Sequence, residues 1–222
     1  MALVATRDEG DRIVATIDAL REAFPSARIV VADDASSDGT SDLALARGAE
    51  VVSRRRAHGK GGSMTAAAAT VAPLAELADP PVFLLCDGDL GGSARALPPL
   101  VAAIESGECD LAVGAFTRRV GGGFGIALRF ARWAIEDRSG YRAGAAISGQ
   151  RAMRGEVLRA VLPFAQGYGM ETAMTIDAVR AGFTLREIEV DLEHRTTGRS
   201  WRGFVHRASQ MADFARVWWS RR

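Results

Sequence analysis

Paired carboxylates follow two apolar segments within the first ninety residues of the chain. Asp33 and Asp34 come directly after one segment, and Asp87 and Asp89 come directly after the other. In an open α/β sheet, ligands bind outside the carboxyl ends of the parallel strands. Carboxylates at such ends suit the hydrogen-bond donors of a ligand, or a hard divalent cation that also binds phosphate oxygens. The sequence therefore predicts one polar site for a metal ion and a phosphorylated ligand.

Lys60 is the only lysine among the 28 basic residues of the chain. It stands between glycines, in the segment Gly59-Lys60-Gly61-Gly62. An ammonium is a compact charge with three donors, whereas a guanidinium is a wide planar fork, so a narrow glycine-lined pocket would admit only the first. A solvated loop lysine is the alternative interpretation. The glycines favour a site, because they permit close approach of the backbone to a ligand.

Strands and helices alternate along the chain in the manner of βαβ units, which favours an α/β fold built on a parallel sheet. Apolar periodicity and turn residues predict strands at 2–6, 28–32, 50–53, 82–86, 111–115 and 184–190. They predict helices at 11–24, 41–47, 63–78, 100–106, 126–137 and 170–181, the third of them kinked at Pro73. The turn after the first strand is acidic and lacks the Gly-x-Gly-x-x-Gly pattern, which disfavours a dinucleotide-binding fold.

The composition is that of an ordinary globular protein, and 222 residues is the length of one domain. The two cysteines, Cys86 and Cys109, form neither a disulfide framework nor a zinc-type motif. No apolar run approaches the length of a membrane span, and no signal-peptide pattern precedes the first strand. These absences predict a cytoplasmic location.

The C-terminal segment is basic and rich in aromatic residues. From Arg195 to Arg222, seven arginines and one acid, Asp213, give a net charge of +6, while the preceding residues carry 21 basic and 26 acidic side chains, a charge of −5. We expect a terminal helix that packs an apolar stripe on the domain. The alternative is a helix that touches anionic lipid headgroups, peripherally at the inner face of the membrane, and its end at Trp218 and Trp219 is the part least expected to be core. Nucleic acid is not an expected partner, because no basic stripe with interleaved aromatic residues runs through the rest of the chain.

Six motifs occur in a fixed order along the chain. They are Asp33-Asp34-Ala35-Ser36-Ser37-Asp38-Gly39-Thr40, Gly59-Lys60-Gly61, Asp87-Gly88-Asp89, Ser148-Gly149-Gln150-Arg151-Ala152, Gly167-Tyr168-Gly169-Met170-Glu171 and His194-Arg195. In this order they resemble the family 2 glycosyltransferases of the GT-A fold, near the branch that includes polyprenyl-phosphate sugar transferases. The resemblance covers nearly the whole chain. Asp-x-Asp alone is a weak signal, whereas the first motif, placed directly after a strand, is a strong one.

The resemblance implies a single GT-A domain over 1–222, with a Rossmann-like, mostly parallel central sheet flanked by helices. Within it, 1–90 would be the nucleotide-binding half and 91–222 the acceptor-binding half. The implied reaction moves a sugar from a UDP- or GDP-sugar, with Mg²⁺ or Mn²⁺ as cofactor. The acceptor would be polyprenyl phosphate or another cell-envelope acceptor, and the alternative is a soluble phosphorylated small acid of the phosphoglycerate type.

The resemblance also implies roles for individual residues. Asp87 and Asp89 would hold the metal, and Asp89 and Glu171 would act in catalysis. The expected nucleotide-sugar contacts are Thr6, Glu9, Asp33, Asp34, Lys60, Asp87, Arg195 and Arg199. His194 is the candidate third metal ligand, because related enzymes bring a late histidine to the metal. The alternative role for His194 is a strand-end histidine bonded to a carboxylate.

Three positions depart from the family pattern. The first loop ends in Ala5-Thr6-Arg7-Asp8-Glu9 rather than in Pro-Ala-Tyr-Asn-Glu. Gly91 stands where polyprenyl-phosphate enzymes often carry a glutamine metal ligand, and Ala173 replaces a second acid after Glu171. Glu171 is therefore the acid of that motif that could orient or deprotonate a hydroxyl acceptor, whereas a phosphate acceptor is already ionised and needs no base.

Two other function classes fit parts of the sequence. A nucleotidyltransferase also uses an α/β sheet and acidic metal ligands, but it would carry a glycine-rich loop with Arg or Lys directly after the first strand, and this chain has none there. A non-catalytic nucleotide-sugar-binding module is disfavoured because Asp87, Asp89, Lys60 and Glu171 are all retained.

Overall fold

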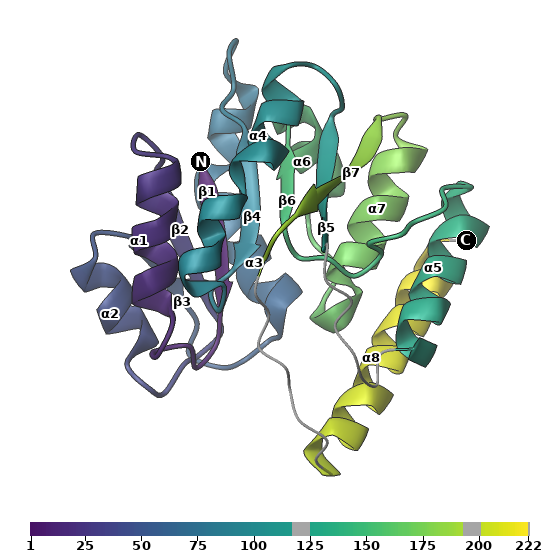
Figure 1. Cartoon of the computed structure of the whole chain (residues 1–222). Helices are drawn as coiled ribbons and strands as arrows, with labels where there is room; N and C mark the ends of the chain where they lie inside the picture. Colours follow the sequence, from purple (N-terminus) through teal and green to yellow (C-terminus); the bar gives the residue numbers. More distant parts are fainter. Residues whose placement is uncertain (117–124, 193–200, 222) are drawn as a thin grey trace.

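The structure is a computed structural model that describes residues 1–116, 125–192 and 201–221, with 116 and 201–210 described by their backbone alone. Within these residues, seven strands form one sheet in the order β3-β2-β1-β4-β6-β5-β7 (Figure 1). The strands are β1 (Ala2–Thr6), β2 (Ile29–Asp33), β3 (Glu50–Ser53), β4 (Phe83–Asp87), β5 (Leu111–Phe116), β6 (Arg151–Met153) and β7 (Leu185–Val190). Neighbouring strands are parallel except at β6, which is antiparallel to β4 and β5. The carboxyl ends of β1, β2 and β4 therefore lie together at one end of the sheet.

Helices cover both faces of the sheet (Figure 1). One face carries α1 (Ile13–Ala23), α2 (Thr40–Ala46) and α4 (Pro98–Glu105). The other face carries α3 (Lys60–Val71), α6 (Gly155–Val161) and α7 (Met170–Arg180). Beyond α7, α5 (Gly125–Ser139) and α8 (Trp201–Ser220) pack side by side. Short 3₁₀ helices occur at Ala72–Glu76, Gly91–Ala96 and Gly167–Gly169.

The central strands supply apolar side chains to both faces. In β1, Ala2 and Val4 pack with the α1 side, whereas Leu3 and Ala5 pack with the α3 side. Successive side chains of a strand point to opposite faces, so a strand covered on both faces needs an apolar residue at every position. This requirement explains why the first half of the chain contains unbroken apolar runs rather than alternating ones.

The C-terminal helix α8 packs an apolar stripe against α5 and α7, as predicted. Phe214 and Val217 of α8 are buried in one cluster with Ile135 of α5 and Ile176 of α7. Trp219, by contrast, is 61% exposed. None of the helices in the described part of the chain has the length and apolar character that crossing a membrane requires.

Most predicted elements are present with ends within two residues of those expected. The exception is the predicted helix at 63–78. α3 begins at Lys60 and stops at Val71, where a 3₁₀ helix containing Pro73 takes over, so the proline ends the helix rather than kinking it. A proline lacks the backbone N–H and its ring clashes with the preceding turn. β6 and α6 were not predicted: β6 has three residues and begins with a buried arginine, Arg151, and α6 has only seven residues.

Candidate functional site

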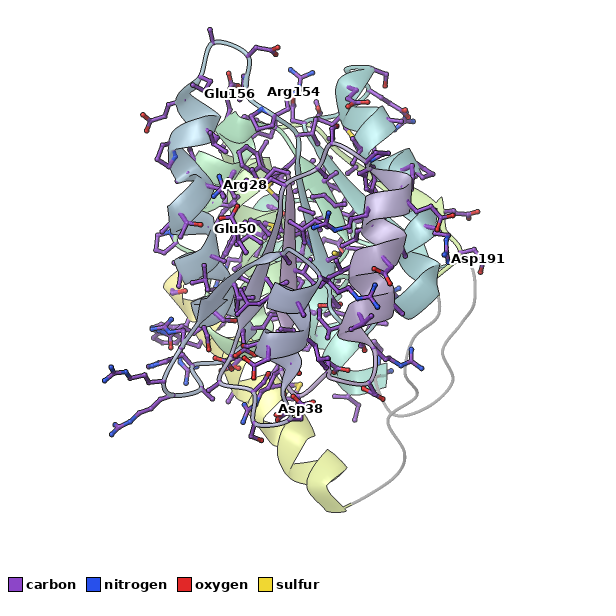
Figure 2. The ribbon with its side chains drawn as sticks, turned by 90° about the vertical axis from the view of Figure 1, so that its left-hand side faces the viewer. Arg28, Asp38, Glu50, Arg154, Glu156 and Asp191 are labelled. Atoms are coloured by element: carbon purple, nitrogen blue, oxygen red, sulfur yellow. The ribbon has the colours of Figure 1, made fainter. Side chains whose placement is uncertain are left out.

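A cavity of about 430 Å³ opens at the carboxyl ends of β1 and β4, beside the start of α3. Its lining includes Ala5, Thr6, Arg7, Glu9, Asp34, Gly59, Lys60, Ser63, Asp87, Gly88, Asp89, Gly167 and Tyr168. Figure 2 shows Asp38, in the loop after β2, at the end of the molecule opposite Arg154 and Glu156. The Asp38 carboxylate accepts a hydrogen bond from the Gly10 N–H (2.8 Å), which joins the loop after β2 to the loop after β1 beside the cavity.

The turn that carries Asp87 and Asp89 is fixed through its backbone. The Gly88 N–H donates to the Ala5 carbonyl (2.8 Å). The buried Thr16 hydroxyl of α1 donates to the Gly88 carbonyl (2.7 Å) and accepts from the Gly91 N–H (2.8 Å). Arg12 donates to the Asp89 carbonyl (3.0 Å). These bonds hold the main chain of the turn, and the main chain in turn positions the two carboxylates.

Gln150 holds Asp87 from the neighbouring antiparallel segment. Its side-chain Nε2 donates to Asp87 Oδ2 (2.7 Å), and its Oε1 accepts from the Asp87 N–H (3.1 Å). Gln150 is completely buried. The amide thus engages both the side chain and the main chain of Asp87, which fixes the rotation of the carboxylate and directs its other oxygen, Oδ1, toward Lys60.

The Lys60 ammonium joins two carboxylates that are far apart in the sequence. Its Nζ lies 2.5 Å from Asp87 Oδ1 and 2.7 Å from Glu171 Oε1. Burial lowers the pKa of Lys60, but the charges of Asp87 and Glu171 outweigh burial and raise the pKa above its usual value. Its side chain remains 27% exposed and lines the cavity. The lysine predicted from the glycine-rich segment is therefore a site residue that carries a strongly held positive charge, not a solvated loop lysine.

Glycines make room for this arrangement. A Cβ at Gly149 would collide with the Lys60 ammonium and the Asp87 carboxylate. A Cβ at Gly61 would collide with the carbonyl of Ala165. The glycine next to Lys60 thus permits close packing of the start of α3 against another segment of the protein, and Gly149 is the glycine that accommodates the ion pair.

The two aspartates at the end of β2 differ in their surroundings. The Asp33 carboxylate accepts bonds from the hydroxyls of Ser36, Ser41 and Ser53 and does not line the cavity. Ser36 lies in the loop after β2, Ser41 in the first turn of α2 and Ser53 at the end of β3, so Asp33 links these three segments. The predicted contact of Asp33 with the nucleotide stays a prediction.

Asp34 does line the cavity. Its carboxylate accepts bonds from the backbone N–H groups of His58 (2.8 Å) and Gly59 (2.9 Å), and the Arg7 guanidinium lies 3.9 Å away. Asp34 therefore connects the end of β2 to the glycine-rich start of α3. Of the two aspartates predicted to contact the nucleotide, Asp34 lines the cavity, and its contact with a ligand stays a prediction.

The first loop brings Thr6 and Glu9 to the cavity. The Glu9 N–H donates to the Thr40 hydroxyl (2.9 Å), which ties the loop after β1 to the start of α2. The Thr6 hydroxyl is buried and finds no hydrogen-bond partner among the described residues. Buried hydroxyls are nearly always bonded, so Thr6 presents an unmet polar group at the cavity wall.

Three predicted site residues, His194, Arg195 and Arg199, lie outside the described residues. Their predicted roles in metal and phosphate binding stay predictions. In the described ranges, no group of three or more His, Cys, Asp or Glu side chains gathers in a way that could hold a metal. Of the carboxylates that line the cavity, Asp87 and Asp89 stand two positions apart on one turn.

The sequence did not assign roles to Gln150 and Gly149. Both stand in a segment that the motif order singled out, Ser148-Gly149-Gln150-Arg151-Ala152, yet neither residue type identifies a function by itself. The signal that would have found them is the pairing of β6 with β4, which places this segment beside Asp87.

Comparison with known proteins places the chain in a family. The chain matches the family described as glycosyl transferase family 2 over residues 2–161. It is similar to an undecaprenyl-phosphate mannosyltransferase from Micrococcus luteus, with 30% identity over 216 residues that cover 90% of this chain and 86% of the relative.

Solved structures show the same fold. Glucosyl-3-phosphoglycerate synthase from Mycobacterium tuberculosis, in complex with phosphoglyceric acid, has a TM-score of 0.76 at 24% identity, covering 97% of this chain and 78% of that chain. The same enzyme in complex with Mn²⁺, UDP and glucosyl-3-phosphoglycerate has a TM-score of 0.74 at 23% identity, with the same coverage. The predicted GT-A fold is confirmed. Because the family match spans well over half of the chain, this protein belongs to glycosyl transferase family 2.

Proposed function

We propose that this protein transfers a hexose from a UDP- or GDP-sugar to the phosphate of a polyprenyl phosphate, in a reaction that depends on Mg²⁺ or Mn²⁺. The observation that carries the proposal is the cavity in which Asp87, Asp89 and Lys60 meet at the carboxyl ends of β1 and β4. The mannosyltransferase relative, whose acceptor is undecaprenyl phosphate, supports the choice of acceptor.

The donor set of the cavity fits a hard divalent cation. Mg²⁺ is commonly bound through one or two carboxylates plus substrate phosphates, rather than by a cage made only of protein ligands. Asp87 and Asp89 would hold the metal, and Asp87 Oδ1 already has a cationic partner at 2.5 Å, the Lys60 ammonium. When bound, the metal would act as a Lewis acid on the diphosphate leaving group.

The remaining cavity residues suit the rest of the donor. The unbonded Thr6 hydroxyl offers a polar contact at the cavity wall. Asp34 and Glu9 offer carboxylates to ribose hydroxyls or to base N–H groups, and Lys60 offers its ammonium to the diphosphate. Bonds to charged groups are stronger than neutral ones, which favours Lys60 as the main protein contact to the diphosphate.

A phosphate acceptor agrees with the surroundings of Glu171. The Glu171 carboxylate is buried and pairs with Lys60 at 2.7 Å. The ammonium already occupies Glu171 Oε1, so an acceptor hydroxyl would have to displace Lys60 to reach that oxygen. The arrangement therefore favours an acceptor that attacks as an anion and needs no general base.

Gln150 gives the first testable consequence of this site. Gln150→Leu removes the bond to Asp87 Oδ2 and leaves the carboxylate free to rotate. A bond to a charged group contributes about 1.5–3 kcal/mol, so we expect binding of UDP with Mn²⁺ to weaken by roughly tenfold or more. Calorimetric titration measures the change, and thermal unfolding of the same variant checks that it folds.

The matched control is Gln166→Leu, which alters an exposed glutamine. We expect its affinity to equal that of the unaltered protein. Equal affinities for Gln150→Leu and Gln166→Leu would mean that Gln150 does not position Asp87 for ligand binding.

Helices α5 and α8 carry an exposed aromatic surface that suits a lipid acceptor. Trp133 lies 5.4 Å from Trp218, measured between ring centroids, and Trp218 lies 6.3 Å from Trp219. Trp133 is 46% exposed, and Ile126 of α5 is 68% exposed. Arg129 and Arg132 lie on the same helix as Trp133 and Ile126. Aromatic side chains combined with basic ones are typical of helices that lie at a membrane surface.

α8 also reaches the rim of the cavity. The Tyr168 N–H, on a residue that lines the cavity, donates to Asp213 of α8 (3.1 Å). A membrane held by α5 and α8 would therefore lie on elements that are connected to the donor cavity.

We accordingly predict binding to anionic liposomes at low salt, measured by co-sedimentation. The double variant Trp219→Ser with Ile126→Ser should bind several-fold less, because it removes two exposed apolar side chains from this surface. The attraction that remains comes from basic residues, which add only about 1 kcal/mol each near an anionic surface and which salt screens. Leu45→Ser, at an exposed apolar residue of α2, is the control. Equal binding by all three proteins would exclude this surface as the membrane contact.

An activity assay tests the proposed function directly. Thermal-shift measurements with UDP- and GDP-sugars and Mn²⁺ or Mg²⁺ identify the donor, because a ligand that binds only the native state stabilises it. Incubation of that donor with undecaprenyl phosphate should move the sugar into the lipid-extractable fraction. Sugar that stays water-soluble under these conditions, with every donor that binds, would refute the lipid acceptor.

A soluble phosphorylated acid is the second candidate acceptor. The observation that favours it is the fold similarity to glucosyl-3-phosphoglycerate synthase, which covers 97% of this chain. The same assay with 3-phosphoglycerate separates the two candidates, because its product would be water-soluble. A hydroxyl acceptor of this kind would require a base, and Glu171 would then have to be released from Lys60.

A further inference from the structure

We propose that Lys60 competes with the divalent cation for Asp87, so that the metal binds well only together with the donor diphosphate. The proposal rests on the proposed function in one respect, the role of Asp87 as a metal ligand. It adds that Lys60 makes metal binding and donor binding depend on each other.

Both Asp87 oxygens have protein partners. Oδ2 accepts from the Gln150 amide at 2.7 Å, and Oδ1 lies 2.5 Å from Lys60 Nζ. Gln150 is buried and engages the Asp87 N–H as well, so the carboxylate cannot rotate without breaking that pair of bonds. The oxygen that Gln150 does not engage, Oδ1, is therefore the one that Lys60 holds.

A divalent cation at Asp87 Oδ1 would stand beside the ammonium. A metal–oxygen bond to Mg²⁺ is about 2.0–2.1 Å long, which is shorter than the Lys60 contact to the same atom. The two cations would then repel each other across a few ångströms in a partly buried site, where screening by water is weak. Metal alone should therefore bind weakly as long as Lys60 keeps its position.

Lys60 has alternative partners that allow it to leave Asp87. Its Nζ also contacts Glu171 at 2.7 Å, and its side chain is partly exposed to the cavity where the diphosphate would lie. A lysine stem is long and flexible, with donors that rotate freely. When a diphosphate arrives, Lys60 can keep Glu171, donate to a phosphate oxygen and release Asp87 Oδ1 to the metal.

Gly149 supports the idea that this position of Lys60 is built into the fold. A side chain at residue 149 would displace both the ammonium and the Asp87 carboxylate. The contact therefore depends on a glycine in the same segment as Gln150. One short segment thus fixes Asp87 and leaves space for the lysine.

The expected consequence is a coupling between two ligands, and such couplings are reciprocal. In the unaltered protein, UDP should tighten Mn²⁺ binding strongly. In Lys60→Met, which keeps the length of the stem and removes the charge, Mn²⁺ alone should bind about tenfold tighter, a change equal to about 1.4 kcal/mol. UDP should bind more weakly to the same variant, because it loses the ammonium. The coupling between Mn²⁺ and UDP should fall accordingly.

The experiment is a titration of Mn²⁺ followed by electron paramagnetic resonance of the free ion, with and without UDP. Lys60→Arg keeps the charge, so Mn²⁺ alone should still bind weakly. Arg154→Met removes a charge of the same sign at the far end of the molecule (Figure 2) and should leave Mn²⁺ binding unchanged. Lys60→Gln serves as a second neutral variant if Lys60→Met unfolds at a lower temperature.

The outcomes separate this inference from the proposed function. If Mn²⁺ binds no more tightly to Lys60→Met or Lys60→Gln, yet Asp87→Asn abolishes Mn²⁺ binding in the presence of UDP, the competition is refuted and the metal site stands. If Asp87→Asn leaves Mn²⁺ binding unchanged in the presence of UDP, both the metal site and the competition are refuted. Tighter binding to Lys60→Met that is lost when Asp87→Asn is added supports the inference.

Discussion

Asp89→Ala is expected to abolish the metal dependence of nucleotide binding and to reduce sugar transfer by at least about 100-fold, the scale for loss of one group that stabilises charge in a transition state. Asp87 and Asp89 line the cavity together. Their charges repel a diphosphate until a divalent cation bridges the two anions. We therefore expect the unaltered protein to bind UDP or GDP weakly in EDTA and much more tightly with Mn²⁺, as calorimetry would measure.

The fold should survive this substitution. Arg12 donates to the carbonyl of Asp89, and the turn around Gly88 is held by backbone bonds to Ala5 and Thr16. These bonds engage the main chain of the turn, which the substitution leaves in place, so Asp89→Ala should remain folded, as thermal unfolding would check. The loss of activity would then reflect the site rather than a general loss of structure.

Asp79→Ala is the matched control for this experiment. Asp79 is exposed and precedes β4, whereas Asp89 follows it, so the two substitutions remove the same charge from opposite ends of one strand. We expect Asp79→Ala to keep the metal dependence in full. Equal nucleotide affinity in EDTA and in Mn²⁺ for the unaltered protein would rule out the metal assignment.

The strands that are buried on both faces could be predicted well from the sequence. Strands β1, β2 and β4 are buried on both faces, so their sequences are unbroken apolar runs between helices and turn residues. Such runs are recognisable without a structure. The order of strands and helices then limits the sheet to a few arrangements.

β6 could not be predicted in the same way. It has three residues and contains Arg151, which is almost completely buried. Arginine is rarely buried without partners. Here it is retained by bonds to the Ser148 carbonyl (2.9 Å) and the Thr175 hydroxyl (3.0 Å), and burial lowers its pKa to about 10, so it remains charged at neutral pH. The Thr175 partner lies 24 positions away on α7, and only the tertiary structure brings it to Arg151.

Some residues of the candidate site could be predicted from the local sequence, and others depend on the tertiary structure. Asp87, Asp89 and Lys60 were recognisable because they follow strands or stand between glycines, and the structure brings all three to one cavity. Asp33 follows a strand in the same way, yet its carboxylate accepts bonds from Ser41 in α2 and Ser53 at the end of β3. Gln150 was missed because its bond to Asp87 spans 63 positions and depends on β6. Local patterns find residues near a strand end, but pairing across the sheet decides which of them face the ligand.

Lys60→Arg is expected to weaken nucleotide binding by about 1–3 kcal/mol, the scale for a lost bond to a charged group. The ammonium fits between Asp87 and Glu171, with contacts of 2.5 and 2.7 Å, and Gly149 packs against it. A guanidinium has the same charge but is wider and planar. It should therefore disturb the packing around Gly149 or move away from one of the two carboxylates, although the charge of the site is unchanged.

Arg95→Lys is the reverse exchange at an exposed ion pair, where the shape of the cationic group should not matter. Arg95 pairs with Glu22 at 2.6 Å on the surface, where both side chains are more than half exposed. Exposed ion pairs contribute little to stability, so Arg95→Lys should leave nucleotide binding unchanged. Calorimetric titration of UDP with Mn²⁺ compares the two variants. If Lys60→Arg bound the nucleotide as tightly as Arg95→Lys, the position would require only a positive charge. The single lysine of the chain would then have no explanation in the shape of the site.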